Sequence, residues 1–157
     1  MAGKVKPIPD GFHTATPYLI IKDAAGAIEF YKKAFGATEL IRHADPGGKV
    51  RHAEIKIGDS PIMIADEFPE FPDHLSPQSR GGATAHHYLY VEDVDAIFSR
   101  AIAAGAKMRM PVADQFYGDR SGGLTDPFGH VWWIATHKED LSPEEIERRA
   151  AAAFGRS

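Results

Sequence analysis

The side chains best suited to chemistry in this sequence are two histidines and a carboxylate, in two stretches rich in strand-forming residues. His52 and Glu54 are two residues apart within residues 50–57, and His86 opens the stretch 86–91. Side chains two apart on a strand share a face, so His52 and Glu54 should lie together. Two histidines and one carboxylate suit Fe(II), Mn(II), Zn(II) or Ni(II). One hypothesis is therefore a divalent metal site made of His52, Glu54 and His86.

In a second hypothesis, the same side chains bind no metal ion. His52 is then a hydrogen-bonded wall residue, and Glu54 forms an ion pair with Lys56 or Arg120. In the enzymatic alternative, Glu54 or His52 is instead a general base that removes a proton from an acidic C–H bond. We favour the metal-free hypothesis and leave the metal, the cofactor and the catalytic residues unassigned, with Glu54 as the candidate base.

Three further side chains are candidates for binding a small molecule. Tyr88 should share a face with His86, because the two are two residues apart. Trp133 offers a flat surface for an aromatic ligand, although core or interface packing explains it equally well. Arg120 can hold a carboxylate or phosphonate through two parallel hydrogen bonds, or be structural and paired with Asp119 or the other half of the chain. The predicted ligand is a small aromatic or anionic molecule, and its predicted binding residues are His52, Glu54, His86, Tyr88, Arg120 and Trp133.

A long internal repeat indicates which elements position these side chains. The stretch from Tyr18 to Asp23 is repeated 70 residues later, from Tyr88 to Asp93. Each copy precedes a helical pattern that ends in Gly-Ala, and these two dipeptides are 69 residues apart. A repeat of this length exceeds the unit of a solenoid. The sequence therefore predicts one β-α-β-β-β module used twice, in an α+β fold.

Hydrophobic periodicity and turn signals place the elements of both modules. The first module is expected to have a helix over 24–35 and strands over 16–21, 38–43, 50–57 and 62–65. The second is expected to have a helix near 94–104 and strands over 86–91, 107–112, 122–125 and 130–136, with Tyr117 to Arg120 in a loop. Ser142, Pro143 and Glu145 form the pattern of a capping box with proline at the first helical position, which predicts a C-terminal helix. We expect one domain over 1–157, with module one at about 14–66, a connector at 67–85, module two at about 86–137 and the last helix at about 143–154.

Composition excludes several classes of protein. The 157 residues are 43% hydrophobic, which is enough for a compact core. A net charge of −4 argues against nucleic acid and anionic membranes as partners. No apolar run approaches the length of a membrane span, and the absence of cysteine excludes disulfides and thiolate metal sites. These features favour a cytoplasmic protein without a membrane or nucleic-acid partner.

The doubled module and the turn Asp126-Pro127-Phe128-Gly129-His130 resemble the vicinal oxygen chelate superfamily. That group includes glyoxalase I, the bleomycin and fosfomycin resistance proteins and extradiol dioxygenases. Within it, three strings look like the PhnB-like branch: residues 52–54, residues 115–120 and residues 135–144. The resemblance implies that the two sheets curl into a shared half-barrel cleft, and that the chain forms a homodimer.

Enzymes of this superfamily hold a divalent metal that acts as a Lewis acid and template. The resemblance places the metal ligands at Thr16, His86, Trp133 and a position near Ile64, of which only His86 is a good ligand. The usual metal set therefore looks incomplete. The resemblance implies a small-molecule-binding protein of the glyoxalase and bleomycin-resistance type. The alternative is a divalent-metal-dependent lyase, isomerase or dioxygenase that uses His52, Glu54 and His86.

Overall fold

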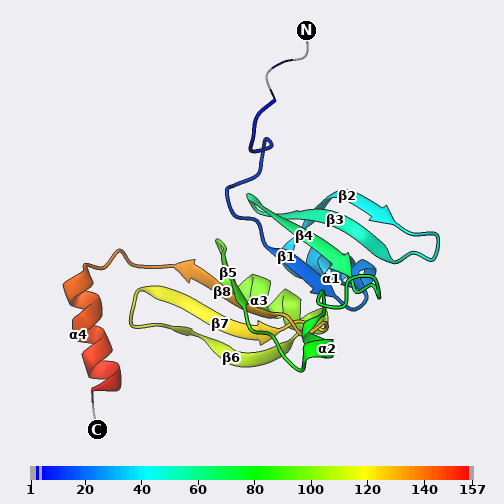
Figure 1. Ribbon diagram of the computed structural model, residues 1–157. Helices are drawn as coiled ribbons and strands as arrows, with labels where there is room; N and C mark the ends of the chain where they lie inside the picture. Colours follow the sequence, from blue (N-terminus) through cyan, green and yellow to red (C-terminus); the bar gives the residue numbers. More distant parts are fainter. Residues whose placement is uncertain (1–2, 4, 156–157) are drawn as a thin grey trace. The chain divides into compact units, whose positions relative to one another are not determined.

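The structure is a computed structural model that describes residue 3 and residues 5–155. Contacts divide the chain into two compact units, the first extending to Gly82 and the second beginning at Ala83 (Figure 1). Each unit contains a four-stranded sheet and two helices, and the order of elements confirms the predicted tandem β-α-β-β-β modules followed by a C-terminal helix. None of the described helices is long and apolar enough to cross a membrane.

The first unit is built on a sheet of strand order β1-β4-β3-β2. Strands β1 and β4 are parallel, whereas β4, β3 and β2 follow one another antiparallel. The element bounds are β1 Tyr18–Ile21, α1 Ala24–Phe35, β2 Thr38–Ala44, β3 Val50–Ile57, β4 Ser60–Asp66 and α2 Pro77–Arg80.

Helix α1 covers one face of this sheet (Figure 1). It forms as predicted because its apolar residues recur at the helical period, and Ile28 and Tyr31 are fully buried. The sheet side chains beneath it, such as Ile55 and Ile64, are fully buried as well. The other face carries the partly polar side chains of β1, β3 and β4 and is called the open face of the first unit below.

The start of α1 is held by two carboxylates. Asp23 caps the helix as predicted, because its side chain accepts a hydrogen bond from the backbone N–H of Gly26 at 3.0 Å. Asp66, at the end of β4, accepts hydrogen bonds from the backbone N–H groups of Asp23, Ala24 and Val50. Asp66 is buried, and its carboxylate thus joins β1, α1 and β3.

The second unit repeats this topology with strand order β5-β8-β7-β6. Strands β5 and β8 are parallel, and β8, β7 and β6 are antiparallel. The element bounds are β5 His86–Tyr90, α3 Val94–Ala103, β6 Lys107–Asp114, β7 Asp119–Thr125, β8 Val131–His137 and α4 Pro143–Phe154.

Helix α3 packs on one face of the second sheet, over Trp132 and Ile134, which are both fully buried (Figure 1). Gly122 on β7 makes this packing possible. A Cβ atom on Gly122 would lie 2.9 Å from both the Phe98 ring of α3 and the Val112 side chain. Trp133 lies between Trp132 and Ile134 in the chain and therefore points to the opposite face of the sheet. This face is called the open face of the second unit.

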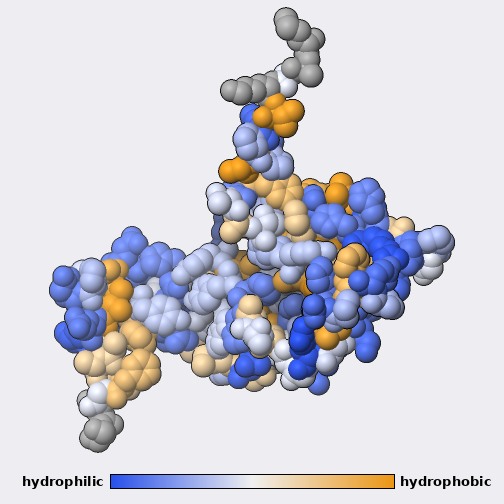
Figure 2. Space-filling model, viewed as in Figure 1, coloured by the Kyte–Doolittle hydropathy of each residue, from blue (hydrophilic) through white to orange (hydrophobic). Residues whose placement is uncertain are grey.

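The C-terminal helix α4 begins as predicted but lacks one half of the capping box. The Ser142 hydroxyl accepts a hydrogen bond from the backbone N–H of Glu145 at 3.2 Å. The Glu145 carboxylate instead binds the guanidinium groups of Arg148 and Arg149. None of the residues of α4 is buried, and Figure 2 shows hydrophilic and hydrophobic side chains on different parts of its surface.

Two expectations about local structure were wrong. Residues 119 and 120 lie in β7 and not in a loop, because the ladder with β8 continues to the pair Asp119 and His137. The connector also contains the short helix α2, which the sequence analysis did not predict. Ser76 caps it, and a proline follows at the first helical position, as at the start of α4.

Candidate functional site

The open face of the first unit carries the paired candidates His52 and Glu54. Both lie on β3, two residues apart, and His52 Nε2 forms a hydrogen bond with Glu54 Oε1 at 3.1 Å. Both side chains are partly buried. The Tyr18 ring of β1 contacts the His52 ring edge-on, with the ring centroids 6.2 Å apart. Glu54 therefore pairs with His52, whereas the sequence analysis had expected a cationic partner, Lys56 or Arg120.

The proposed metal ligands are divided between the units. His52 and Glu54 belong to the first unit, and His86 belongs to the second. Within residues 3 and 5–155, no three histidine, aspartate or glutamate side chains lie close enough together to hold a metal ion. The first unit therefore supplies two adjacent ligands, and a complete set needs at least one more from elsewhere.

The open face of the second unit is aromatic and is centred on Trp133. Strand pairing places Tyr88 on β5 beside Trp133 on β8, and Trp133 beside Gly123 on β7. A Cβ atom on Gly123 would lie 2.7 Å from the Trp133 ring. The indole therefore lies directly against the β7 backbone, in space that only a glycine leaves free.

His86 fixes the indole through its N–H group. The Trp133 Nε1–H group donates a hydrogen bond to His86 Nδ1 at 3.0 Å. Because Nδ1 accepts this bond, the His86 proton must lie on Nε2 in the neutral imidazole. Trp133 is only half-buried, whereas Trp132 is fully buried. The result is a flat, partly exposed indole with a fixed orientation.

A polar cluster adjoins this aromatic surface. Asp119, at the start of β7, is only 4% exposed. Its Oδ2 atom accepts hydrogen bonds from the hydroxyl groups of Tyr90 at 2.9 Å and Tyr88 at 3.4 Å. Its Oδ1 atom pairs with His137 Nδ1 at 2.8 Å, and His137 Nε2 lies 2.9 Å from Asp140.

This environment shifts three pKa values in the cluster. Burial, followed by a hydrogen bond with Tyr117, raises the pKa of Tyr88. The hydrogen bond to Asp119 raises the pKa of Tyr90. Hydrogen bonds with Asp119 and Asp140 raise the pKa of His137, because both carboxylates favour the imidazolium. The two tyrosines thus stay protonated over the whole physiological range.

Arg120 lies on the opposite side of the second sheet from this cluster. Its guanidinium group forms two hydrogen bonds with the Asp95 carboxylate of α3, at 2.8 and 2.9 Å. A third bond, at 3.2 Å, joins it to Asp114 on β6. The strand alternation of β7 points Arg120 toward α3 and its neighbour Asp119 toward the open face. The structure thus separates Arg120 from Tyr88 and Trp133, and its partners differ from those expected.

Asp119, Tyr90 and His137 were not among the predicted binding residues. Two strings that resembled the PhnB-like branch meet here, residues 115–120 and 135–144. Gly118 accepts hydrogen bonds from the backbone N–H groups of Lys138 and Glu139, and Asp119 binds His137 directly. Extending β8 by one residue would have placed His137 on the same face as Trp133, four residues earlier.

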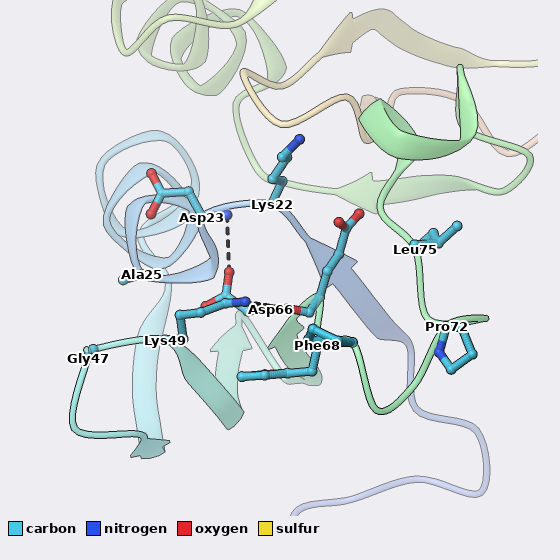
Figure 3. A pocket seen from close by; sticks show the side chains of 12 residues that line it. Lys22, Asp23, Ala25, Gly47, Lys49, Asp66, Phe68, Pro72 and Leu75 are labelled. Carbon is cyan, nitrogen blue, oxygen red and sulfur yellow. Dashed lines mark hydrogen bonds between the residues drawn. The ribbon is translucent and has the colours of Figure 1, made fainter.

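The first unit also contains a pocket of ≈ 810 Å³ at the ends of β1 and β4 (Figure 3). Its walls come from the start of α1, the turn between β2 and β3, and the connector. They include the apolar side chains of Ala25, Phe68, Pro69, Pro72 and Leu75.

Several polar groups of this pocket have partners within the first unit. Figure 3 shows the Asp66 carboxylate directed at the backbone of Asp23, and the Lys49 ammonium donates a hydrogen bond to the Glu67 carbonyl at 2.6 Å. Hydrogen bonds from Ser76 and Ser79 lower the pKa of Glu67 to about 2. These bonds hold the connector against the sheet, so the pocket offers mainly apolar contacts.

Comparisons with known proteins agree with this architecture. The profile of the Glyoxalase/Bleomycin resistance protein/Dioxygenase superfamily matches residues 12–134. The uncharacterized protein Rv0887c of Mycobacterium tuberculosis is 41% identical over 134 residues, covering 84% of this chain and 79% of that protein.

Two solved structures have similar folds. The Arabidopsis thaliana protein At5g48480 is 26% identical with a TM-score of 0.63, covering 79% of this chain and 98% of that chain. A protein of Bacillus cereus described as a putative 3-demethylubiquinone-9 3-methyltransferase, PhnB protein, is 21% identical with a TM-score of 0.60, covering 79% and 99%. The profile match and the identity to the mycobacterial protein show that this chain belongs to the Glyoxalase/Bleomycin resistance protein/Dioxygenase superfamily.

Proposed function

We propose that this protein binds a small, flat aromatic molecule on the open face of its second unit. The observation that carries the proposal is the fixed position of Trp133, which lies against Gly123 and donates a hydrogen bond to His86. A partly exposed indole held in one orientation loses little conformational freedom when a ligand stacks on it. Tyr88, beside Trp133 in the sheet, extends the aromatic surface.

The anionic alternative for the ligand has weaker support than the aromatic one. Arg120 was the side chain proposed to clamp a carboxylate or phosphonate, and its guanidinium group binds Asp95 and Asp114. Binding an anion through Arg120 would require the loss of at least one of these ion pairs. We therefore assign recognition to the aromatic side chains, with His86 as the residue that orients Trp133.

We also propose that the chain belongs to the PhnB-like branch of its superfamily. The support is the match of residues 52–54, 115–120 and 135–144 to that branch, together with the similar fold of the Bacillus cereus PhnB protein. The cytoplasmic location and the homodimer stay predictions from the sequence.

The alternative function is a divalent-metal-dependent lyase, isomerase or dioxygenase that uses His52, Glu54 and His86. The hydrogen bond between His52 and Glu54 favours it, because a metal ion could replace the shared proton and bind both groups. A metal bound there would act as a Lewis acid on substrate oxygens. Metal content of untagged protein, measured by plasma mass spectrometry, tests this alternative. About one metal per chain, lost in Glu54→Ala and in His86→Ala, would support it.

Calorimetric titration with naphthylmethanol, a flat neutral aromatic probe, tests the main proposal. We expect binding to the wild-type protein and a loss of affinity of about 5- to 150-fold in Trp133→Ala, because stacking on an aromatic side chain is worth about 1–3 kcal/mol. Met63→Ala is the matched control, since Met63 pairs with Tyr18 in the first unit as Trp133 pairs with Tyr88 in the second. Equal affinity in wild-type and Trp133→Ala protein would refute the proposed site.

A further inference from the structure

We propose that Tyr88, Tyr90 and Asp119 make the second unit selective for aromatic ligands that carry an ammonium or another hydrogen-bond donor. This inference rests on the proposed function, since it assumes a ligand on the open face near Trp133. It specifies the chemistry of the polar end of that ligand, which the stacking surface leaves undefined.

The Tyr90 hydroxyl can still accept a hydrogen bond after it has donated one to Asp119. A tyrosine hydroxyl has one hydrogen to donate, and an ionised carboxylate can only accept. Tyr90 gives its hydrogen to Asp119 Oδ2 at 2.9 Å, and Tyr88 is directed at the same atom at 3.4 Å. The lone pairs of the Tyr90 oxygen therefore remain to accept a hydrogen bond. A ligand that meets this oxygen must supply the donor.

The charge of Asp119 and the two tyrosine rings favour a cationic group. Asp119 is almost fully buried behind Tyr88 and Tyr90, and its charge is therefore less screened by water than that of a surface carboxylate. The two tyrosine rings lie with their centroids 5.2 Å apart, and their side chains are 43% and 66% exposed. Aromatic faces attract cations, and Tyr is one of the favoured residues for this contact.

The charges around the cluster also favour a cation over an anion. His137 contacts Asp119 Oδ1 on one side of its ring and Asp140 on the other, so a protonated His137 is balanced by two carboxylates. Arg120, the neighbour of Asp119 in the sequence, points to the other face and is neutralised by Asp95 and Asp114. A ligand carboxylate at Tyr90 would face the lone pairs of the Tyr90 oxygen and would be repelled by the negative charge of Asp119.

The position of the cluster suits a ligand stacked on Trp133. Tyr88 pairs with Trp133 across the β5–β8 ladder, and Tyr90 is two residues further along β5, on the same face. An aromatic ring on Trp133 would thus place a substituent toward Tyr90. The combination of a stacking surface and an adjacent acceptor describes an arylalkylamine in its protonated form.

Three probes of one shape test this inference by calorimetric titration of the full chain. They are naphthylmethylammonium, naphthylmethanol and naphthylacetate, which present a cation, a neutral donor and an anion on the same ring. For wild-type protein we expect the ammonium to bind about tenfold more tightly than the acetate, a ratio typical of one partly desolvated cation–π contact. The alcohol should lie between them.

Two variants then assign the preference to the cluster. Tyr90→Phe removes the acceptor and keeps the ring, and its exposed position makes loss of folding unexpected. Asp119→Asn removes the charge. Each should reduce the preference for the ammonium over the acetate to about threefold or less, and Tyr90→Phe should also weaken binding of the alcohol, which loses the same acceptor. Tyr18→Phe is the matched control, because Tyr18 occupies in β1 of the first unit the position that Tyr88 occupies in β5 of the second. The Tyr18→Phe protein should keep the full preference for the ammonium.

The outcomes separate this inference from the proposed function. Equal binding of all three probes, lost in Trp133→Ala, would support stacking and overturn the selectivity. A preference for the ammonium that persists in both Tyr90→Phe and Asp119→Asn would overturn the role of the cluster. Failure of every probe to bind wild-type protein would contradict the proposed function and the inference together.

Discussion

The open faces of the two units occupy the same positions of one repeated module and carry different chemistry. In the first unit, the row across the sheet reads Tyr18, Met63 and Glu54. In the second unit, the corresponding row reads Tyr88, Trp133 and Gly123. The first face thus holds a carboxylate bound to a histidine, where the second holds an indole that needs a glycine beneath it.

The helix-covered faces differ much less. Ile64 in the first unit and Ile134 in the second are both fully buried, at equivalent places in β4 and β8. Packing against a helix requires an apolar side chain of suitable volume, whereas the open face has no such requirement. The duplicated module therefore keeps its core and leaves the open face free to specialise.

Buried carboxylates provide the largest expected difference between the units. Asp66 accepts hydrogen bonds from three backbone N–H groups, which cannot turn toward water when it is removed. Asp119 binds the side chains of Tyr90 and His137, and these can turn toward water when the carboxylate is removed. We expect Asp66→Ala to lower the free energy of unfolding by about 3 kcal/mol and Asp119→Ala by about 1 kcal/mol. Urea denaturation measures both, and an equal loss would show that Asp119 is also part of the structural framework.

The adjacent glycines of β7 give the next largest contrast. A Cβ atom at Gly122 would be closest to Phe98, Val112 and a backbone oxygen in the core, whereas the three atoms closest to one at Gly123 all belong to the Trp133 ring. We expect Gly122→Ala to cost about 1–3 kcal/mol of unfolding free energy, as overpacking does. Gly123→Ala should cost less, because Trp133 can swing outward, but it should weaken binding of the naphthyl probes. Gly123→Ala protein that binds the probes normally would contradict the role of the fixed indole.

Two histidines of the second unit should change stability in opposite directions with pH. Burial, then the charge of His130, lowers the pKa of His87 from 6.5 to about 4. The unfolded chain therefore takes up this proton first, and stability falls as the pH drops from about 6.5 to about 4. The pKa of His137 is raised by Asp119 and Asp140, so its contribution is present below its ordinary pKa and is lost as the pH rises through the raised value.

Urea denaturation at a series of pH values tests both signs. His87→Gln should flatten the acid side of the stability profile, and His137→Gln should flatten the side above pH 6.5, the ordinary pKa of histidine. The effect of His137 should be smaller than those of the buried carboxylate and the glycines, since His137 is half-exposed. Wild-type pH profiles in both variants would show that neither histidine is coupled to folding.

The fold was accessible from the sequence because its signals are local. Helix α1 has a periodic apolar face, a capping Asp23 and a closing Gly36, and the predicted bounds equal those observed. The shared face of His52 and Glu54 also followed from strand alternation alone. The short helix α2 was missed although Ser76 and Pro77 repeat the signal that was recognised at Ser142 and Pro143.

The site was less accessible because it depends on strand register and strand length. Arg120 was grouped with Trp133 because residues 117–120 were expected in a loop, where alternation gives no information. Once β7 begins at Asp119, its neighbour Arg120 must point to the opposite face. The pairing of Asp119 with His137 is likewise set by the turn that joins β7 to β8, which fixes which residues face each other.

The most direct test of the account is nuclear magnetic resonance of the tryptophan indole N–H groups during titration with naphthylmethylammonium. The chain has two tryptophans, and Trp132 is an internal reference because its indole is buried and donates a hydrogen bond to Asp126. A Trp133→Phe variant assigns the two signals. The account predicts a saturable shift of the Trp133 signal while the Trp132 signal stays nearly constant. A Trp133 signal that does not move while the probe binds elsewhere would contradict the proposed site.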